Sequence, residues 1–391
     1  MQGKYYFCKK YNGFGMKGIK IRNYKSFRDE VNMELRPITV LIGRNSSGKS
    51  SLCKLVDALS VSLCNDAEGF LPLQTGHNRL GDRYDDLFYQ RITNDLQIGV
   101  CFDGGKCIET TFLMQDGFFC PKSFTARNGE QVASKTFTSW EESNQAGFVG
   151  LYLPQICDEV SVTSDDVQFS VDYIGPVRCR AQRRIERASV RKSNYVEDDG
   201  TRAYDMLLMS HLTDGTLLRR VSDWFKANMD GQSLNISETS PGSGIFSLYV
   251  ERGEAHVNIA DVGEGLAQVL PVIVQSFVRN ADITIIEQPS LHLNSAAHAL
   301  VACRLAASSV ELGKKYIIET HSDTFLTGIR LMVAERKLDR EDVVIYYVHH
   351  DGDSAMLDKI EIDDNYEYTS WPDGMFEDDY RLQNEIIRIL G

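Results

Sequence analysis

A glycine-rich stretch, GRNSSGKSS at residues 43–51, carries the clearest chemical signal in this sequence. It matches the pattern G-x-x-x-x-G-K-[ST] and follows an apolar run at residues 38–42, as the pattern requires. In such a loop, backbone N–H groups surround phosphate oxygens, the lysine reaches the β and γ phosphates, and the hydroxyl joins a Mg²⁺ shell. We predict Lys49 as a catalytic residue and Ser50 as a metal ligand. The predicted nucleotide-binding residues are Gly43, Arg44, Asn45, Ser46, Ser47, Gly48, Lys49, Ser50 and Ser51.

A second signal is the carboxylate that ends an apolar run, ITIIE at residues 283–287. A phosphate-binding loop needs an acid at the end of a neighbouring strand to complete its metal shell, and Glu287 fits that requirement. We therefore predict Glu287 as a catalytic residue and metal ligand, with Gln288 beside it in the same site. The alternative is an ordinary buried strand that ends in a solvated glutamate.

A histidine and a glycine turn complete the set of candidate residues. His321 follows the apolar run YIIET and is predicted to be catalytic, because ligands collect at the carboxyl ends of strands in an open parallel sheet. Gly263 and Gly265 open an apolar helix, whose free N–H groups suit an anion, so we predict that both contact the nucleotide. Each signal is weak alone, since a single histidine is often structural and such glycines often only start a helix.

The periodicity of apolar residues predicts an α/β scaffold around these positions. Residues 18–34 and 96–114 alternate as antiparallel hairpins do, and a helix is predicted from the glycine-rich loop to about residue 64. Further helices are predicted at about 201–212, 214–229, from 264, 295–312, 323–337 and at the C-terminus. Further strands are predicted at 245–260 as a pair, and at 282–287, 315–319, 342–348 and 355–362.

Five short segments occur together in a specific order along the chain. They are IRNYKSF (21–27), IGPVRCR (174–180), EQPSLHLN (287–294), ETHS (319–322) and WPDGMFEDD (371–379). With these segments, residues 18–379 resemble ABC-type ATPase heads of the SMC and recombination-repair kind. They resemble more closely a prokaryotic family of stand-alone AAA/ABC-like ATPases that is often found in anti-phage defence systems.

The resemblance implies an α/β fold, namely an ABC-type P-loop NTPase head with an antiparallel β subdomain and a helical middle insertion. Residues 18–175 would form the N-terminal part of the head, with the P-loop and the antiparallel region. Residues 176–245 would be a helical and basic insertion. Residues 246–391 would hold the signature turn, the acid-ended (Walker B) strand, the switch histidine, and a C-terminal hairpin and helix.

The resemblance also implies a mechanism that uses ATP and Mg²⁺. Two heads would pair head to tail, or assemble further, with ATP between one P-loop and the signature turn 261–265 of the other copy. Glu287 would lie on Mg²⁺, His321 near the γ-phosphate, and Leu293 with Asn294 in the D-loop. The partner would be a separately encoded nuclease or toxin.

The sequence departs from these relatives at informative positions. Gln288 replaces the general base of ABC enzymes, and an amide orients water but cannot accept its proton. The signature GEGLAQ has no hydroxyl for a γ-phosphate, and Glu264 would repel one. Ser290 and Asn294 also differ from the relatives. We therefore expect slow turnover, with ATP acting mainly as a conformational switch.

One stretch, 178–192, is strongly basic. It fits contacts to nucleotide or effector, a local nucleic-acid patch, or a solvated helix face. Its basic residues are Arg178, Arg180, Arg183, Arg184, Arg187, Arg191 and Lys192.

The bulk composition narrows the classes of function. A net charge of -13 argues against nucleic-acid binding by the whole surface of the 391-residue chain. No apolar run is long enough to span a bilayer, so we expect no membrane contact. The nine cysteines are scattered and no signal peptide precedes them, so we expect thiols in a reducing cytoplasm.

Two other classes of function are weighed against an ATP-driven switch subunit. One is a self-contained ATP-dependent nuclease with an appended Toprim domain, which does not fit into residues 322–391 after His321. The other is a DNA-repair ATPase that acts directly on DNA through a long coiled coil, but the middle segment has no sustained heptads.

Overall fold

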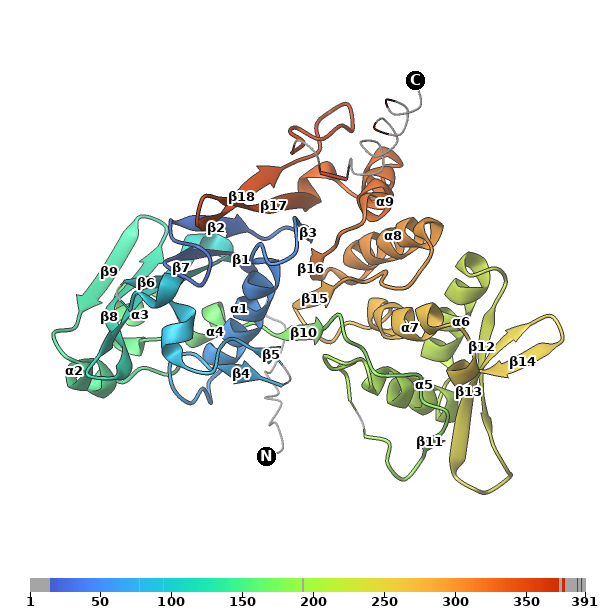
Figure 1. The fold of residues 1–391 in the computed structure, drawn as a ribbon. Coiled ribbons are helices and arrows are strands. Elements are labelled where there is room, and N and C mark those ends of the chain that lie inside the picture. The colour runs from blue at the N-terminus through green and yellow to red at the C-terminus, as the bar shows by residue number, and fades with distance from the viewer. Residues whose placement is uncertain are drawn as a thin grey trace.

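The computed structural model of the chain describes residues 15–76, 78–93, 95–191, 193–372, 375, 376, 385 and 388. Three main sheets organise it, with a central sheet flanked by an antiparallel sheet and, on the other side, by a smaller sheet (Figure 1). Within the described ranges, no helix is both long and apolar enough to cross a membrane.

The central sheet has the strand order β10-β15-β16-β3-β17-β18, and all neighbouring pairs are parallel except β17 with β18. Every residue of β3 and β15 is buried, as expected for parallel strands that are covered on both faces. The strands of this sheet are β3 (Ile38–Ile42), β10 (Val171–Ile174), β15 (Ile283–Glu287), β16 (Lys315–Glu319), β17 (Val343–Asp351) and β18 (Ser354–Ile360). All of them except β10 match strands predicted from the sequence.

Alternate residues of the central strands face two different hydrophobic cores, because side chains alternate across a strand. Ile285 and Ile317 pack with α1 (Lys49–Ser62) and the antiparallel sheet. Ile286 and Ile318 face the core formed with the helices on the other side. Those helices are α7 (Glu264–Ser276), α8 (Ser295–Leu312) and α9 (Asp323–Ala334), all close to their predicted bounds.

The antiparallel sheet has the order β2-β1-β6-β7-β8-β9 and contains both hairpins that the sequence predicts. Its strands are β1 (Met16–Arg22), β2 (Val31–Glu34), β6 (Leu96–Phe102), β7 (Lys106–Gln115), β8 (Phe118–Asn128) and β9 (Gln131–Thr136). Short elements near it are β4 (Gln74–Thr75), β5 (Asn78–Arg79), η1 (Tyr84–Leu87), η2 (Tyr89–Arg91), η3 (Asp103–Gly105), α2 (Trp140–Gln145), α3 (Pro154–Glu159) and α4 (Ser164–Val167).

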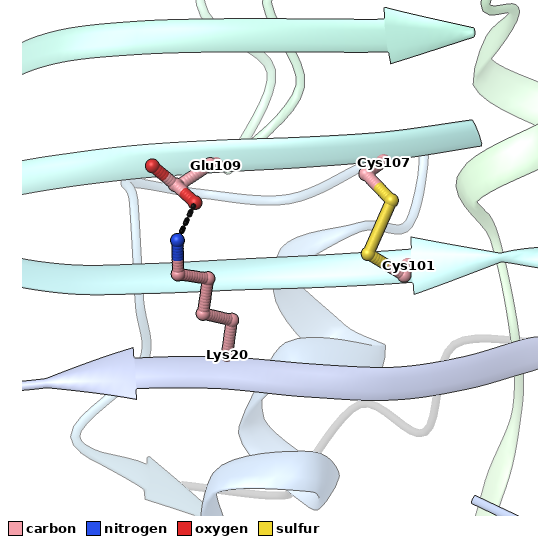
Figure 2. Close-up of a disulfide and its surroundings, with 4 residues drawn as sticks. All are labelled: Lys20, Cys101, Cys107 and Glu109. Atoms are coloured by element: carbon pink, nitrogen blue, oxygen red, sulfur yellow. Dashed lines mark ion pairs between the residues drawn. A yellow bond between two sulfur atoms is a disulfide. The ribbon is translucent and has the colours of Figure 1, made fainter. Parts of the chain in front are cut away.

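One disulfide corrects the expectation that the cysteines are thiols. The turn between β6 and β7 places Cys101 directly opposite Cys107, and the two are bonded (Figure 2). On the same sheet, Lys20 of β1 reaches across β6 to Glu109 of β7, with 3.3 Å between Nζ and Oε2. Gly99 lies between them in register, and its missing side chain leaves room for this ion pair.

The middle segment, predicted as helical, also contains a sheet. Its two predicted helices are present, and the predicted strand pair forms β13 and β14, but β12 was not predicted. Because β12 pairs with β13, this sheet extends past residue 245, where the sequence predicted that the insertion ends. The elements are β11 (Ile185–Glu186), α5 (Arg202–Leu212), α6 (Thr216–Asn228), β12 (Ser233–Glu238), β13 (Ile245–Arg252) and β14 (Ala255–Asn258), followed by η4 (Ile259–Asp261).

The short 3-10 helix η5 (Arg340–Asp342) leads into β17. The chain after β18 is described in part, and in it Trp371 stacks on Tyr368 with ring centroids 4.8 Å apart. Residues 373, 374 and 377–379 of the WPDGMFEDD segment and Lys192 of the basic stretch lie outside the described residues. The same holds for the predicted C-terminal helix, except that residues 385 and 388 are described and are helical.

The start of α7 packs closely against the loop that follows β15. A Cβ atom on Gly265 would lie 2.6 Å from the backbone oxygen of His292, which is shorter than side chains tolerate. At Gly263, the N-cap of α7, nothing lies within 4 Å of the same position. The two glycines therefore differ: packing requires the one at 265 and not the one at 263.

We expect the Gly265→Ala substitution to destabilise the protein, although helix propensity alone favours alanine by up to about 1 kcal/mol. Overpacking against the His292 carbonyl costs about 1–3 kcal/mol and should lower the midpoint of thermal unfolding by a few degrees. Gly263→Ala is the control, with an expected change below about 1 kcal/mol. A higher midpoint for Gly265→Ala would contradict the close contact.

Candidate nucleotide-binding site

The loop at residues 43–51 connects β3 to α1 and needs glycine at both glycine positions of the G-x-x-x-x-G-K-[ST] pattern. Gly43 has φ +142° and Gly48 has φ +111°, and a Cβ atom on Gly43 would lie 2.1 Å from the backbone oxygen of Val348. Gly48 is the N-cap of α1 and makes no side-chain cap, so the first N–H groups of this helix point out of its start without such a partner. This geometry suits a phosphate.

Lys49 is held by the loop itself. Its ammonium donates to the backbone oxygens of Gly43 (3.0 Å) and Arg44 (2.7 Å), and only 3% of its side chain is exposed. Burial lowers the pKa of Lys49, while the carboxylate of Glu319, at 3.9 Å from Nζ, opposes this shift. The ammonium is therefore aimed at the space that the loop encloses.

A cavity of about 410 Å³ lies over the loop and brings together several predicted residues. Gln288 and His321 both line it, from the ends of β15 and β16. Three residues that the sequence-based prediction missed also line it: Lys25, Ser26 and Glu319. All three belong to the segments IRNYKSF and ETHS, in which the sequence signal for them lies.

Two carboxylates meet the loop from neighbouring parallel strands. Glu287 and Glu319 are register partners at the ends of β15 and β16, and each is 5% exposed. The hydroxyl of Ser50 lies 2.8 Å from Glu319 Oε2 and 3.3 Å from Glu287 Oε2. The hydroxyl of Tyr173 donates to the other oxygen of Glu287. The predicted metal ligands Ser50 and Glu287 are thus in contact, with a second acid beside them.

Arg178 holds the backbone at the end of β15 in place. Its guanidinium donates to the backbone oxygens of Glu287 (2.8 Å), Gln288 (3.0 Å) and Gln268 (3.0 Å), and the residue is 6% exposed. Burial lowers its pKa to about 10, so it stays protonated at neutral pH. This arginine positions the backbone and does not reach the cavity lining.

Gln288 has an unusual backbone conformation, with φ +49°. Its N–H donates to the backbone oxygen of Glu319 at 2.7 Å, and its own carbonyl accepts from Leu291 at 3.2 Å. Left-handed backbone at a residue other than glycine costs energy and is kept where the surroundings require it. The tight turn places the amide of Gln288 at the cavity.

His321 is exposed at the rim of the cavity. Partial burial of its ring against the loop and the nearby Lys49 ammonium lower its pKa, which favours the neutral imidazole. A second histidine, His298 of α8, lies between two loops of the site. Its ring contacts the hydroxyl of Ser322 at 2.7 Å and the backbone oxygen of Leu293 at 3.2 Å. His298 therefore links the predicted D-loop to the segment that follows His321.

The predicted signature turn lies apart from this cavity. Gly263 and Gly265 start α7 and are not among the described residues that line the cavity. Asp261, just before them, is bound by the guanidinium of Arg183 in a two-pronged ion pair, with 2.9 Å between Nη1 and Oδ2. The structure does not bring the turn to the P-loop of the same chain.

The arginines of the basic stretch at 178–192 have different environments in the structure. Arg178 is buried under β15, and Arg183 is tied to Asp261. Where it is described, the stretch is loop and β11, not a helix. Its exposed arginines other than Arg183 are Arg180, Arg184, Arg187 and Arg191.

Comparisons with known proteins agree with this geometry. Residues 16–167 match the family described as AAA ATPase domain, and no curated protein matches the chain in sequence. A solved SMC head bound to the C-winged helix domain of ScpA is similar in fold, with a TM-score of 0.52 and 14% identity over 89% of this chain and 98% of that chain.

Two further SMC heads are similar at lower scores. The head with an extended coiled coil, bound to the C-terminal domain of ScpA from Pyrococcus furiosus, has a TM-score of 0.47 and 13% identity over 95% of this chain and 99% of that chain. The SMC head domain from Thermotoga maritima has a TM-score of 0.43 and 10% identity over 89% and 100%. The predicted fold class is confirmed by the first of these structures: the chain has the fold of an ABC-type ATPase head, and its N-terminal part matches an AAA ATPase domain.

Proposed function

We propose that this chain is an ATP-hydrolysing switch subunit that closes around ATP as a dimer, turns over slowly, and controls a partner effector. The observation that carries the proposal is Gln288 at the wall of the P-loop cavity. An amide can orient the attacking water by hydrogen bonds, but it cannot accept the proton that a general base removes. ATP bound at such a site would hold one conformation for a long time before hydrolysis releases it.

The residues present fit Mg²⁺ together with ATP. Hard cations prefer oxygen ligands, and Ser50 and Glu287 offer a hydroxyl and a carboxylate beside the phosphate-binding loop. Among the described residues, no group of three or more His, Cys, Asp or Glu forms a metal site, so phosphate oxygens would complete the shell. When bound, Mg²⁺ would neutralise charge on the phosphates. Lys49 would bind the β and γ phosphates, and His321 would lie near the γ phosphate.

A second copy of the chain would complete the site. The start of α7 lies away from the P-loop cavity of its own chain and makes no side-chain cap, so its N–H groups suit a phosphate on another protomer. The assembly would be a head-to-tail dimer or a higher homo-oligomer. Glu264 and the missing hydroxyl in the signature turn would make this contact weaker than in relatives.

The effector would be a separately encoded nuclease or toxin, in a prokaryotic anti-phage defence system in the cytoplasm. The resemblance of the five ordered segments supports this assignment. The solved SMC head of similar fold was captured with a domain of another protein, ScpA, so a head of this shape can dock a partner. The competing function is a nuclease or repair ATPase that acts directly on DNA, which the exposed arginines of residues 178–192 would favour.

We expect Gln288→Glu to raise ATP turnover by about 100-fold, because the carboxylate restores a proton acceptor beside the attacking water. Phosphate release from the purified chain measures the rate, and Gln288→Asn is the control that keeps an amide. A wild-type rate of tens per second, or an unchanged rate in Gln288→Glu, would contradict the slow-switch proposal.

We expect ATP with Mg²⁺ to convert the protein from one copy to two copies per particle, because each signature turn would bind ATP on the other copy. Light scattering during size-exclusion chromatography measures this mass. Lys49→Ala removes the phosphate-binding ammonium and should stay monomeric, whereas Lys54→Ala, on the same helix but outside the cavity, should dimerise normally. Equal masses with and without ATP in the wild type would rule out the dimer.

For the DNA alternative, the double reversal Arg184→Glu and Arg187→Glu is the appropriate test, since Arg183→Glu would also break the pair with Asp261. If these arginines bind phosphates, each lost contact lowers the slope of log K against log salt by about 0.9. Fluorescence anisotropy of labelled duplex at several salt concentrations measures this. The double reversal of Lys122 and Arg127 on β8 matches the charge change. Equal salt slopes in the two double variants would remove the patch.

A further inference from the structure

We propose that Glu319 is a second acidic ligand of the metal site and the carboxylate that faces the nucleotide. This inference rests on the proposed function, because it concerns the cation that accompanies ATP. The sequence pattern pointed to Glu287 as the acid, since it ends the strand before Gln288. The contacts of the two glutamates indicate that Glu319 is the one that faces the cavity.

The position of Glu319 follows from strand pairing. β15 and β16 are parallel neighbours, and Glu287 and Glu319 stand opposite each other in register. Side chains at register partners lie on the same face of a sheet. Both carboxylates are therefore presented to the same side at the carboxyl end of the sheet, next to the loop that follows β3.

The two carboxylates differ in what they contact. One oxygen of Glu287 accepts the hydroxyl of Tyr173, and the other lies 3.3 Å from the hydroxyl of Ser50. Glu319 makes the shorter contact to Ser50, at 2.8 Å, and lines the cavity, which Glu287 does not. Its other oxygen lies 3.9 Å from the Lys49 ammonium. Glu319 therefore has more capacity left for a ligand in the cavity.

The charge balance of the cluster also calls for a cation. Two buried acids stand beside one buried ammonium, that of Lys49. The other buried cation nearby, Arg178, donates to backbone oxygens and makes no ion pair with either carboxylate among the described contacts. A buried carboxylate is kept ionised by a partner of opposite charge. A divalent cation held by Ser50 and both glutamates provides it, and Mg²⁺ commonly takes one or two carboxylates together with phosphates.

The alternative is that Glu319 only stiffens the loop through Ser50 and Lys49. The two roles predict opposite results when ATP binding is measured without metal. A stiffening residue is needed with or without the cation. A metal ligand is not needed in EDTA, where its negative charge repels the phosphates.

The test measures the affinity of the full chain for ATP by calorimetry, once in EDTA and once in excess Mg²⁺. In the wild type, Mg²⁺ should tighten binding. In Glu319→Gln, whose amide oxygen still accepts from Ser50, this metal-dependent gain should fall by about tenfold or more. Binding in EDTA should be unchanged or tighter. Glu341→Gln, an exposed acid before β17, is the control and should keep the wild-type gain.

A second measurement observes the cation directly. Electron paramagnetic resonance of Mn²⁺ in the presence of ATP should show a larger free Mn²⁺ signal for Glu319→Gln than for the wild type. The inference is overturned if Glu319→Gln keeps the wild-type Mg²⁺ gain within twofold, or if its affinity in EDTA falls together with that in Mg²⁺. A wild-type chain that binds no ATP in either condition would overturn the proposed function as well, so the two failures are distinguishable.

Discussion

The parallel pairing of β3, β16 and β15 is the constraint on which the rest of the site depends. Leu41, Glu319 and Glu287 are consecutive partners across these three strands. Just beyond the strands, Thr320 donates to the backbone oxygen of Leu41 at 3.1 Å, and Gln288 donates to that of Glu319 at 2.7 Å. A shift of one residue in either pair would move an acid to the opposite face of the sheet. Burial on both faces opposes such a shift, because alternate residues are committed to two different cores.

Much of this arrangement could be predicted from residue patterns along the chain. The apolar runs that become β3, β15 and β16 are continuous, which is typical of buried parallel strands, and α8 and β16 have the predicted bounds. The alternation of apolar and polar residues over 96–114 predicted the hairpin of β6 and β7. Local patterns succeed here because each element carries its own signal. The placement of Gln288 and His321 at one cavity followed from the rule that ligands collect at strand ends.

The parts that escaped prediction depend on contacts between distant segments. Glu319 stands inside the segment ETHS, but its role depends on strand pairing, which places it opposite Glu287 and beside Ser50. The Cys101 and Cys107 bond arises from their facing positions in a hairpin, whereas composition favoured thiols. The basic stretch shows the same limit. Its arginines look alike in sequence, yet Arg178 is buried under β15 and Arg183 binds Asp261. Burial is a property of the folded chain, so charge counting could not separate them.

The contacts around the loop after β15 bear on how a nucleotide signal could leave the site. Gly265 at the start of α7 packs on the backbone oxygen of His292 in this loop. The backbone carbonyl of the next residue in this loop, Leu293, contacts the ring of His298, and the same ring contacts the hydroxyl of Ser322. The signature turn, the predicted D-loop and the segment after His321 are therefore in continuous contact.

Continuous contact of this kind provides what a switch requires, because none of the three segments can move far without displacing another. The close approach at Gly265 leaves no room for a side chain there, and Gln288 and His292 both hold left-handed backbone, which persists where the surrounding structure requires it. These constraints on the loop, together with an amide at position 288, support the proposed slow switch.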